Sequence, residues 1–360
     1  MKILILTNHS YMLWRFRRDL IRELQQFGEV VISTPFVGHE DDFQSIGCRC
    51  IETDLDRRGV NPYRDMMLLR FYRKLLREER PDLVVTYSIK PNIYGAWLCG
   101  RMKIPCCVNV QGLGSAFQCG GVASLVTAMY RAALKHAKVV FFENESNARE
   151  FVRRGILPAD KPFVLHGAGV DVDYFSYRPY PTEENGIRFL YLGRIMREKG
   201  VDEFFSAAQA VKERHKDQVQ FDLVGFFEDD LAQKAEELQS KGIIRFHGFQ
   251  TDPRPYYEAD HCVVLPSYHE GMSNVLLEAA ATGRALIATD IPGCREAVDD
   301  GVNGFLCKKM DAESLKDCLE RFVALTEEAR REMGIRGRQK IIEVFEKHSV
   351  VYNTIQKIME

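Results

Sequence analysis

Short apolar segments alternate with amphipathic helical segments along most of the chain, and this alternation constrains the fold more than any other feature. Expected strands of the first half cover residues 2–7, 30–34, 48–52, 82–87, 106–110, 139–143 and 163–166. Expected helices lie near residues 14–27, 62–79, 93–102, 122–136 and 146–154. Alternation of this kind predicts βαβ units that build a parallel sheet with helices on both faces.

The second half repeats the pattern after a Gly- and Pro-rich turn at residues 167–181. Its expected strands cover residues 187–192, 221–225, 244–247, 262–265 and 285–289, and the chain is helical beyond Asp311. A chain of 360 residues is too long for one ordinary core. The sequence therefore predicts two α/β domains, at residues 1–168 and 169–343.

One stretch of the second half, from Pro266 to Glu278, contains several candidate ligand-binding groups. A buried strand ends at Pro266, a turn with Glu270 follows, and an apolar helix begins near Asn274. Glu278 is the charged residue of that helix, and a buried carboxylate needs hydrogen-bond donors or a ligand. Amides at a helix N-terminus favour phosphate, which singles out Gly271, Met272, Ser273 and Asn274.

Either glutamate alone has an ordinary explanation: Glu270 as a surface turn residue, Glu278 as a buried acid paired with an arginine. A ligand site is favoured instead by the order of the features: a strand, a proline, a Glu-Gly turn and then a Glu inside a helix. A second strand runs into Gly193-Arg194 and then Lys199-Gly200. Two cations ahead of a helix suit an anionic ligand, although cations near helix starts are common.

These motifs resemble glycosyltransferase family 4, a family of retaining enzymes with the GT-B fold. Glu270 and Glu278 match its Glu-x7-Glu motif, and Arg194 with Lys199 match its pyrophosphate-binding pattern. The resemblance implies two Rossmann-like, doubly wound parallel-sheet domains that face each other across a cleft. It also implies that a C-terminal helix, here residues 344–360, crosses back onto the first domain.

The resemblance further implies a role for each donor-side motif. Glu270 contacts the donor sugar, Glu278 contacts the ribose, and the Gly248-Phe249-Gln250 turn reads the nucleotide base, mostly by backbone. Arg194, Lys199 and the Gly271–Asn274 amides stabilise the departing diphosphate, as an electrostatic clamp would. The expected donor is a UDP-sugar, and no metal or other cofactor is expected because the two cations and the helix take that place.

Polar loops that follow the first-half strands are the expected acceptor side, with Lys90, Asn92, Asn109 and Gln111 as candidates. Many family members have His where this chain has Gln111, close to the reacting sugar, so the resemblance also makes Gln111 a candidate catalytic residue. Three polar segments resemble those of a subgroup that extends polyprenyl-diphosphate-linked or capsule-type saccharides: Lys90-Pro91-Asn92, Gly112 to Ser115 and Asn144 to Asn147. That subgroup contains N-acetylgalactosaminyl- and galactosyltransferases of bacterial surface glycans, such as capsular polysaccharide and O-antigen.

Charge is unevenly distributed, although the net charge is only −2. Residues 1–170 hold 24 Lys and Arg against 17 Asp and Glu, and the second half holds 25 against 34. A basic, aromatic helix at residues 62–79 is either an ordinary solvated face or an interfacial helix on anionic lipid. Nucleic acid is disfavoured because no nucleic-acid motif accompanies the charge.

Scattered cysteines and a first strand that starts at Lys2 predict a cytoplasmic protein. A lipid-linked acceptor and the basic helix at residues 62–79 would bring it to the inner face of the plasma membrane as a peripheral protein. Asp171-x-Asp173 superficially resembles a metal motif but falls in the interdomain turn. Two other functions remain open. One is a GT-B sugar-nucleotide epimerase, and the other is a non-catalytic GT-B subunit of a membrane glycan-assembly complex.

Overall fold

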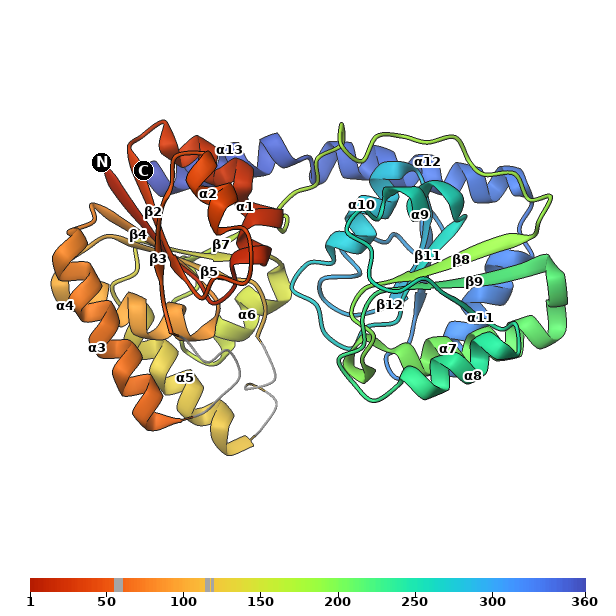
Figure 1. The fold of residues 1–360 in the computed structure, drawn as a ribbon, viewed down its shortest axis with the longest axis horizontal. Coiled ribbons are helices and arrows are strands. Elements are labelled where there is room, and N and C mark those ends of the chain that lie inside the picture. The colour runs from red at the N-terminus through yellow and green to blue at the C-terminus, as the bar shows by residue number, and fades with distance from the viewer. Residues whose placement is uncertain (55–60, 114–116, 118–119) are drawn as a thin grey trace. The chain divides into compact units, whose positions relative to one another are not determined.

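The computed structural model describes residues 1–54, 61–113, 117 and 120–360. It forms two compact units, Met1–Ala168 with Val350–Glu360 and Gly169–Ser349, and each has its own parallel sheet (Figure 1). Parallel sheets of this kind bury both faces under helices. Two α/β units with all-parallel sheets confirm the predicted fold class.

The first unit contains a seven-stranded sheet in the order β3-β2-β1-β4-β5-β6-β7. All its strand pairs are parallel, and β1 lies between β2 and β4. The strands are β1 (Lys2–Leu6), β2 (Glu29–Thr34), β3 (Arg49–Glu52), β4 (Leu83–Tyr87), β5 (Cys106–Val110), β6 (Val139–Phe142) and β7 (Pro162–Val164).

Apolar side chains that alternate along these strands separate into two cores, one on each face of the sheet. Val351 and Ile355 of the C-terminal helix join the core that contains Ile3 and Ile5. The helical elements of this unit are α1 (Ser10–Gln25), α2 (Glu40–Ser45), α3 (Pro62–Glu79), a π-helical turn η1 (Pro91–Gly95), α4 (Ala96–Met102), α5 (Gly120–Leu134), α6 (Glu145–Arg153) and most of α13 (Lys347–Met359).

The second unit contains a six-stranded parallel sheet in the order β10-β9-β8-β11-β12-β13. Its strands are β8 (Ile187–Leu192), β9 (Val219–Val224), β10 (Arg245–Phe246), β11 (Cys262–Leu265), β12 (Ala285–Thr289) and β13 (Gly304–Cys307). Strand β13 was not predicted, because it is only four residues long and begins at a glycine. It pairs with β12 at the edge of the sheet.

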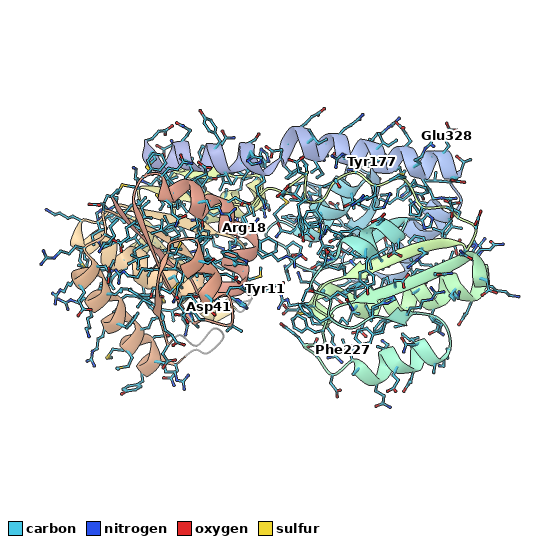
Figure 2. All side chains as sticks on the ribbon, turned by 45° about the horizontal axis from the view of Figure 1, so that its top comes forward. Tyr11, Arg18, Asp41, Tyr177, Phe227 and Glu328 are labelled. Atoms are coloured by element: carbon cyan, nitrogen blue, oxygen red, sulfur yellow. The ribbon has the colours of Figure 1, made fainter. Side chains whose placement is uncertain are left out.

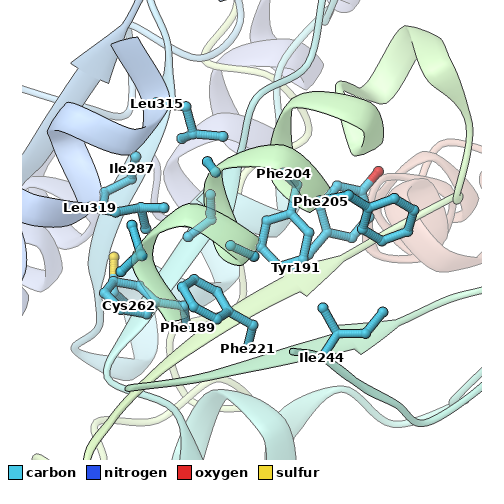
Figure 3. Packing of buried hydrophobic residues seen from close by; sticks show 14 of the residues in the cluster. Phe189, Tyr191, Phe204, Phe205, Phe221, Ile244, Cys262, Ile287, Leu315 and Leu319 are labelled. Atoms are coloured by element: carbon cyan, nitrogen blue, oxygen red, sulfur yellow. The ribbon is translucent and has the colours of Figure 1, made fainter. Parts of the chain in front are cut away.

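Two cores again cover the two faces of this sheet. One is rich in aromatic rings, with Phe189 stacked on Phe221 and Phe204 edge-on to Phe221 (Figure 3). The other packs α10 (Asn274–Thr282) against the sheet. The remaining helices are η3 (Arg197–Lys199), α7 (Val201–His215), η4 (Lys216–Gln218), α8 (Ala232–Ser240), α9 (Arg254–Ala259), α11 (Ala312–Val323) and α12 (Glu327–Val344).

The boundary near the C-terminus lies later than the predicted residue 343. Residues 344–349 belong to the second unit, because Val170 pairs with the segment around Glu346. The Val170 N–H donates to the Phe345 carbonyl at 2.8 Å, and the Lys347 N–H donates to the Val170 carbonyl at 3.0 Å. Phe345 itself is buried in the core of that unit. Residues 350–360 alone return to the first unit.

Candidate active site

The predicted donor segments follow β8 and β11, two neighbouring strands of the second sheet. The chain order reverses here, since β8 has β9 on one side and β11 on the other. Open parallel sheets bind ligands outside the carboxyl ends of their strands at such a switch point. Residues 193–200 and 266–273 both lie at that edge.

Lys199 and Glu270 form the central contact of this edge. The Lys199 Nζ donates to the Glu270 Oε1 at 2.5 Å, and both side chains are mostly shielded from solvent. Gly200 follows Lys199 with φ +70° and caps the start of α7. Beside Glu270, burial and then the Lys309 cation lower the pKa of His269. The pair brings a cation and an acid from two separate segments together.

Two glycines hold the Glu270 turn in place. A Cβ on Gly200 would lie 1.9 Å from the Pro266 carbonyl oxygen, and a Cβ on Gly293 would lie 2.7 Å from the Glu270 Cβ. The Tyr268 N–H also donates to the Glu198 carbonyl at 2.9 Å. The two segments therefore touch at backbone level, where a side chain would keep them apart.

Glu278 lies inside α10 and is only 5% exposed. The Tyr257 hydroxyl, from α9, donates to its Oε2 at 2.9 Å. A hydroxyl donor of this kind offsets part of the cost of burying the carboxylate. The apolar character of the helix, predicted from the sequence, is confirmed by its buried residues from Leu276 to Thr282.

The N-terminus of α10 begins at Asn274, and Ser273 is its N-cap. The Ser273 Oγ accepts from the Leu276 N–H at 3.4 Å, while the Ser273 N–H donates to the Gly293 carbonyl at 2.9 Å. Ser273 is thus occupied with capping and with the turn. Among the described residues, the amides of Asn274 and Val275 have no protein acceptor, as expected for a first helical turn.

Arg194 follows β8, as Lys199 does, whereas the turn predicted to read the base, residues 248–250, follows β10 at the edge of the sheet. The Arg194 side chain is 41% exposed, and its Nη1 donates to the Glu228 Oε2 at 2.9 Å. Phe249 is exposed, whereas the Gln250 Nε2 donates to the His247 carbonyl at 2.7 Å. Each predicted cation therefore has its own acid, Glu270 for Lys199 and Glu228 for Arg194.

The predicted acceptor residues belong to the first unit and divide into two kinds. Asn92 and Asn109 are buried, and they bond to β4 and β5 rather than to open space. The Asn92 Oδ1 accepts from the Thr86 hydroxyl at 2.7 Å, its Nδ2 donates to the Asn109 carbonyl at 2.8 Å, and the Asn109 Nδ2 donates to the Thr86 carbonyl at 3.3 Å. Both amides therefore brace the ends of β4 and β5, and their contact with an acceptor stays a prediction.

Lys90 and Gln111 are half-buried at the same sheet edge. The Lys90 Nζ pairs with the Asp65 Oδ1 at 2.8 Å. Gly112 is also described, whereas Gly114 and Ser115 of the same motif lie outside the described residues. Nearby, Arg17 contacts Glu143 at 2.6 Å, and this buried pair was not predicted.

Two residues of the donor edge were missed from the sequence: Tyr257 and Glu228. Each acts on a predicted residue from a distant segment, so no local pattern marks it. Asp171, by contrast, accepts from the N–H groups of Asp173 and Tyr174 at 3.1 and 2.8 Å. Within the described ranges, no group of three His, Cys, Asp or Glu side chains could hold a metal ion.

Comparison with known proteins follows the same division of the chain. A model described as "Glycosyl transferase 4-like domain" matches residues 13–168, and one described as "Glycosyl transferases group 1" matches residues 186–324. An N,N'-diacetylbacillosaminyl-diphospho-undecaprenol alpha-1,3-N-acetylgalactosaminyltransferase of Campylobacter jejuni is 27% identical over 335 residues, 88% of each chain. A UDP-Gal:alpha-D-GlcNAc-diphosphoundecaprenol alpha-1,3-galactosyltransferase of Escherichia coli is 27% identical over 73% of this chain and 72% of its own.

Solved structures agree on the fold. Anabaena Alr3699/HepE in complex with UDP and glucose has a TM-score of 0.80 at 17% identity, covering 100% of this chain and 99% of its own. Sucrose-phosphate synthase from Thermosynechococcus elongatus has a TM-score of 0.75 at 20% identity, covering 99% and 98%. With both domain models matched in order and the fold shared throughout, the chain belongs to the glycosyltransferases of family 4 with the GT-B fold.

Proposed function

We propose that this glycosyltransferase moves a hexose or N-acetylhexosamine, with retention of configuration, from a UDP-sugar to a polyprenyl-diphosphate-linked saccharide. The observation that carries the proposal is the Lys199–Glu270 pair at the switch point of the second sheet, beside Arg194 and the first turn of α10. Cations and helix amides at one edge suit a diphosphate. Carboxylates beside them suit sugar and ribose hydroxyls.

Departure of UDP builds negative charge on the diphosphate, and catalysis requires groups that stabilise this charge more than the ground state. Lys199, Arg194 and the Asn274 and Val275 amides are the groups proposed for this task. A bound diphosphate would attract Lys199, and Glu270 would then accept hydrogen bonds from donor hydroxyls. Glu278, already bonded to Tyr257, would accept from the ribose. No metal is required in this scheme.

Relatives support the choice of substrates. The structure of HepE contains UDP, and a further HepE structure contains UDP-glucose. The names of the Campylobacter jejuni and Escherichia coli relatives both specify acceptors carried on diphospho-undecaprenol. We extend both chemistries to this chain, with Lys90 and Gln111 as acceptor contacts and Asn92 and Asn109 as the residues that position their loops.

An acceptor held on a lipid places the enzyme at a membrane surface, and α3 is the element proposed to dock there. In the part of the chain that the structure describes, no helix is both long enough and apolar enough to cross a membrane. The outer face of α3 exposes Tyr63, Met66 and Met67, and over the following turns it exposes four cations: Arg70, Arg73, Lys74 and Arg77. Exposed aromatic and apolar side chains beside cations fit an anionic leaflet, here the cytoplasmic one.

The experiment that tests the function has two stages. Saturation-transfer NMR against UDP- and GDP-sugars identifies the donor, and mass analysis of products with a diphosphoundecaprenyl-saccharide acceptor then detects transfer. We expect a UDP-sugar to bind and the acceptor to gain one sugar residue, with the anomeric configuration of the product read by NMR. Inversion at that centre would contradict retention. Conversion of the donor with no acceptor present would instead support the epimerase alternative.

A further inference from the structure

Three aromatic rings of the first unit lie together where α1 and α2 begin. Tyr11 and Trp14 belong to the first turns of α1, and His39 is the residue before α2. The Trp14 ring stacks on the His39 ring with centroids 6.0 Å apart, and the Tyr11 ring (Figure 2) lies 5.5 Å from the His39 ring. All three side chains are half-buried, so each ring keeps part of its surface in solvent.

This Tyr11–Trp14–His39 cluster lies at the switch point of the first sheet. Strand β1 has β2 on one side and β4 on the other, and ligands bind outside the carboxyl ends of strands at such a point. Tyr11 follows β1, and His39 follows β2. The Ser88 hydroxyl, directly after β4, donates to the Asn8 Oδ1 at 2.6 Å. The cluster therefore shares a sheet edge with the segment that contains Lys90, a proposed acceptor contact.

Two residues of this edge have a strained backbone. His39 has φ +64° and Ser88 has φ +74°, a region that a residue with a Cβ rarely adopts. Arg80 and Lys103 share it, but they end α3 and α4, where a left-handed residue is common. His39 instead precedes a helix, and Ser88 follows a strand. Strain of this kind persists where the surrounding structure enforces it, and it concentrates at ligand-binding sites.

Contacts within the unit hold the three rings in place. Phe43 of α2 is fully buried and meets the indole ring of the cluster edge-to-face at 5.1 Å. The Ser10 Oγ accepts from the Val37 N–H at 2.8 Å, which joins the loop after β1 to the loop after β2. The imidazole Nδ1 of the cluster bonds to the Asp42 Oδ2 at 2.6 Å. Since the rings are ordered in advance, a ligand would lose little affinity to their immobilisation.

The cations beside the cluster are already engaged. Arg15 donates to the phenol hydroxyl of the cluster at 3.1 Å, and Arg18 pairs with Asp19 at 3.5 Å. The first turn of α2, directly after His39, contains three acids: Glu40, Asp41 and Asp42. A phosphate group would meet these carboxylates next to the rings, and like charges repel. A neutral ligand therefore fits the surroundings better than an anionic one.

We propose that Tyr11, Trp14 and His39 bind a sugar ring of the acceptor saccharide. The inference rests on the proposed function and adds three acceptor-contacting residues to Lys90 and Gln111. A pyranose has C–H groups on its faces and hydroxyls at its rim, and the negative face of an aromatic ring attracts C–H groups. The phenol, indole N–H and imidazole at the ring edges can bond to the sugar hydroxyls. A lipid chain would use none of these polar groups.

Steady-state kinetics with a diphosphoundecaprenyl saccharide as acceptor tests the cluster. The variants are Tyr11→Ala and His39→Gly, the second because glycine adopts φ +64° without strain. The matched control is Phe27→Ala, an exposed phenylalanine just beyond the far end of α1. We expect each cluster variant to raise the KM for the acceptor about fivefold, the size of one aromatic contact, and to keep the wild-type KM for the UDP-sugar. The control should keep both values.

Fluorescence gives an independent measurement, because Trp14 is itself a reporter. The chain has two tryptophans, Trp14 and Trp97, so Trp97→Phe leaves Trp14 as the single one. We expect the diphosphoundecaprenyl saccharide to change the Trp14 emission and undecaprenyl diphosphate without a sugar to leave it unchanged. His39→Gly in the same background should weaken the response to the saccharide.

A wild-type KM for the acceptor in both Tyr11→Ala and His39→Gly would overturn the sugar-binding role while leaving the proposed function intact. Equal rises in the KM for acceptor and donor would also overturn it, since they would indicate general damage to the enzyme. An equal Trp14 response to the sugar-free lipid would assign the rings to the lipid instead. A wild type that transfers no sugar to any diphosphoundecaprenyl saccharide would overturn both proposals.

Discussion

At the scale of single residues, the donor edge holds its cations in ion pairs that a ligand has to share. Arg194 is bonded to Glu228 and is 41% exposed, whereas Lys199 is bonded to Glu270 and more shielded. Both cations are proposed to stabilise charge on the departing diphosphate, so removing one should slow the chemical step more than it weakens folding.

Arg194→Ala tests this role directly. We expect kcat/KM to fall by a factor that corresponds to about 2–4 kcal/mol of transition-state stabilisation. Arg197→Ala is the matched control, because Arg197 lies in the same segment, is 59% exposed and pairs with Asp202 and Asp229 instead. Steady-state kinetics with the identified donor measures both. Equal activity of Arg194→Ala and the control would remove Arg194 from the clamp.

Gly200→Ala tests the backbone contact that places Glu270. Both Gly200 and Gly242 have φ near +70°, so an alanine at either should cost about 1–2 kcal/mol for the backbone alone. At Gly200 the new Cβ would also meet the Pro266 carbonyl, whereas at Gly242 it would meet nothing within 4 Å. We expect Gly200→Ala to lose about 1–3 kcal/mol more than Gly242→Ala in urea unfolding, and to lose activity as well. Comparable losses would show that the contact is easily relaxed.

Metal independence is a further prediction at this scale. The Asp171 carboxylate accepts two backbone N–H groups in the turn at the start of the second unit, which gives it a local structural task. We expect activity to survive excess EDTA, since a cation clamp needs no divalent ion. Loss of activity that Mn²⁺ restores would reassign Asp171 and Asp173 as metal ligands.

At the scale of elements, the sequence was informative where one continuous segment contains the pattern. Strand β11, the Glu270 turn and α10 are contiguous, so hydrophobicity and the Glu spacing predicted all three. Tyr257 could not be predicted, because it reaches Glu278 from another helix, 21 residues away. The bonds that Asn92 and Asn109 make at the ends of β4 and β5 could not be predicted either, because only the fold brings their partners together.

A buried histidine next to β11 should make the stability of the second unit depend on pH. His261, just before it, is fully buried, and its Nδ1 accepts from the Arg188 N–H at 3.0 Å. Burial lowers the pKa of His261 to about 4. Because the unfolded state takes up a proton near pH 6.5, stability should fall as pH drops from there toward 4, by about 2 kcal/mol at pH 5.

Urea unfolding at pH 7.5 and pH 5 measures this loss. His261→Gln should flatten the pH dependence, whereas His348→Gln, at an exposed histidine, should keep the wild-type slope. Identical slopes for the wild type and both variants would show that His261 does not control acid stability.

At the scale of the whole molecule, the two units carry opposite charge. The first, residues 1–168 with 350–360, holds 25 Lys and Arg against 18 Asp and Glu, a net of +7. The second is therefore −9, since the chain totals −2. Attraction to an anionic leaflet should accordingly act on the first unit, through the exposed cations of α3, and leave donor binding on the second unaffected.

Vesicle sedimentation tests whether the first unit binds membranes while donor binding on the second unit is unaffected. Each cation near an anionic surface contributes about 1 kcal/mol, and salt screens it beyond about 10 Å at 0.1 M. We expect co-sedimentation with anionic vesicles at low salt, release at high salt and weak binding to neutral vesicles. Replacing the four α3 cations by Gln (Arg70, Arg73, Lys74 and Arg77) should abolish binding and preserve UDP-sugar affinity.

The control removes the same charge from elsewhere on the same unit, at four exposed cations outside α3: Arg101, Lys103, Lys135 and Arg149. If net charge alone drives attraction, the two quadruple variants should lose binding equally. If the α3 face docks, the control should keep most of its binding, because Tyr63, Met66 and Met67 add apolar contact only beside the α3 cations. Undiminished binding by the α3 variant would identify this face as ordinary solvated surface and would favour an acceptor that is free in solution.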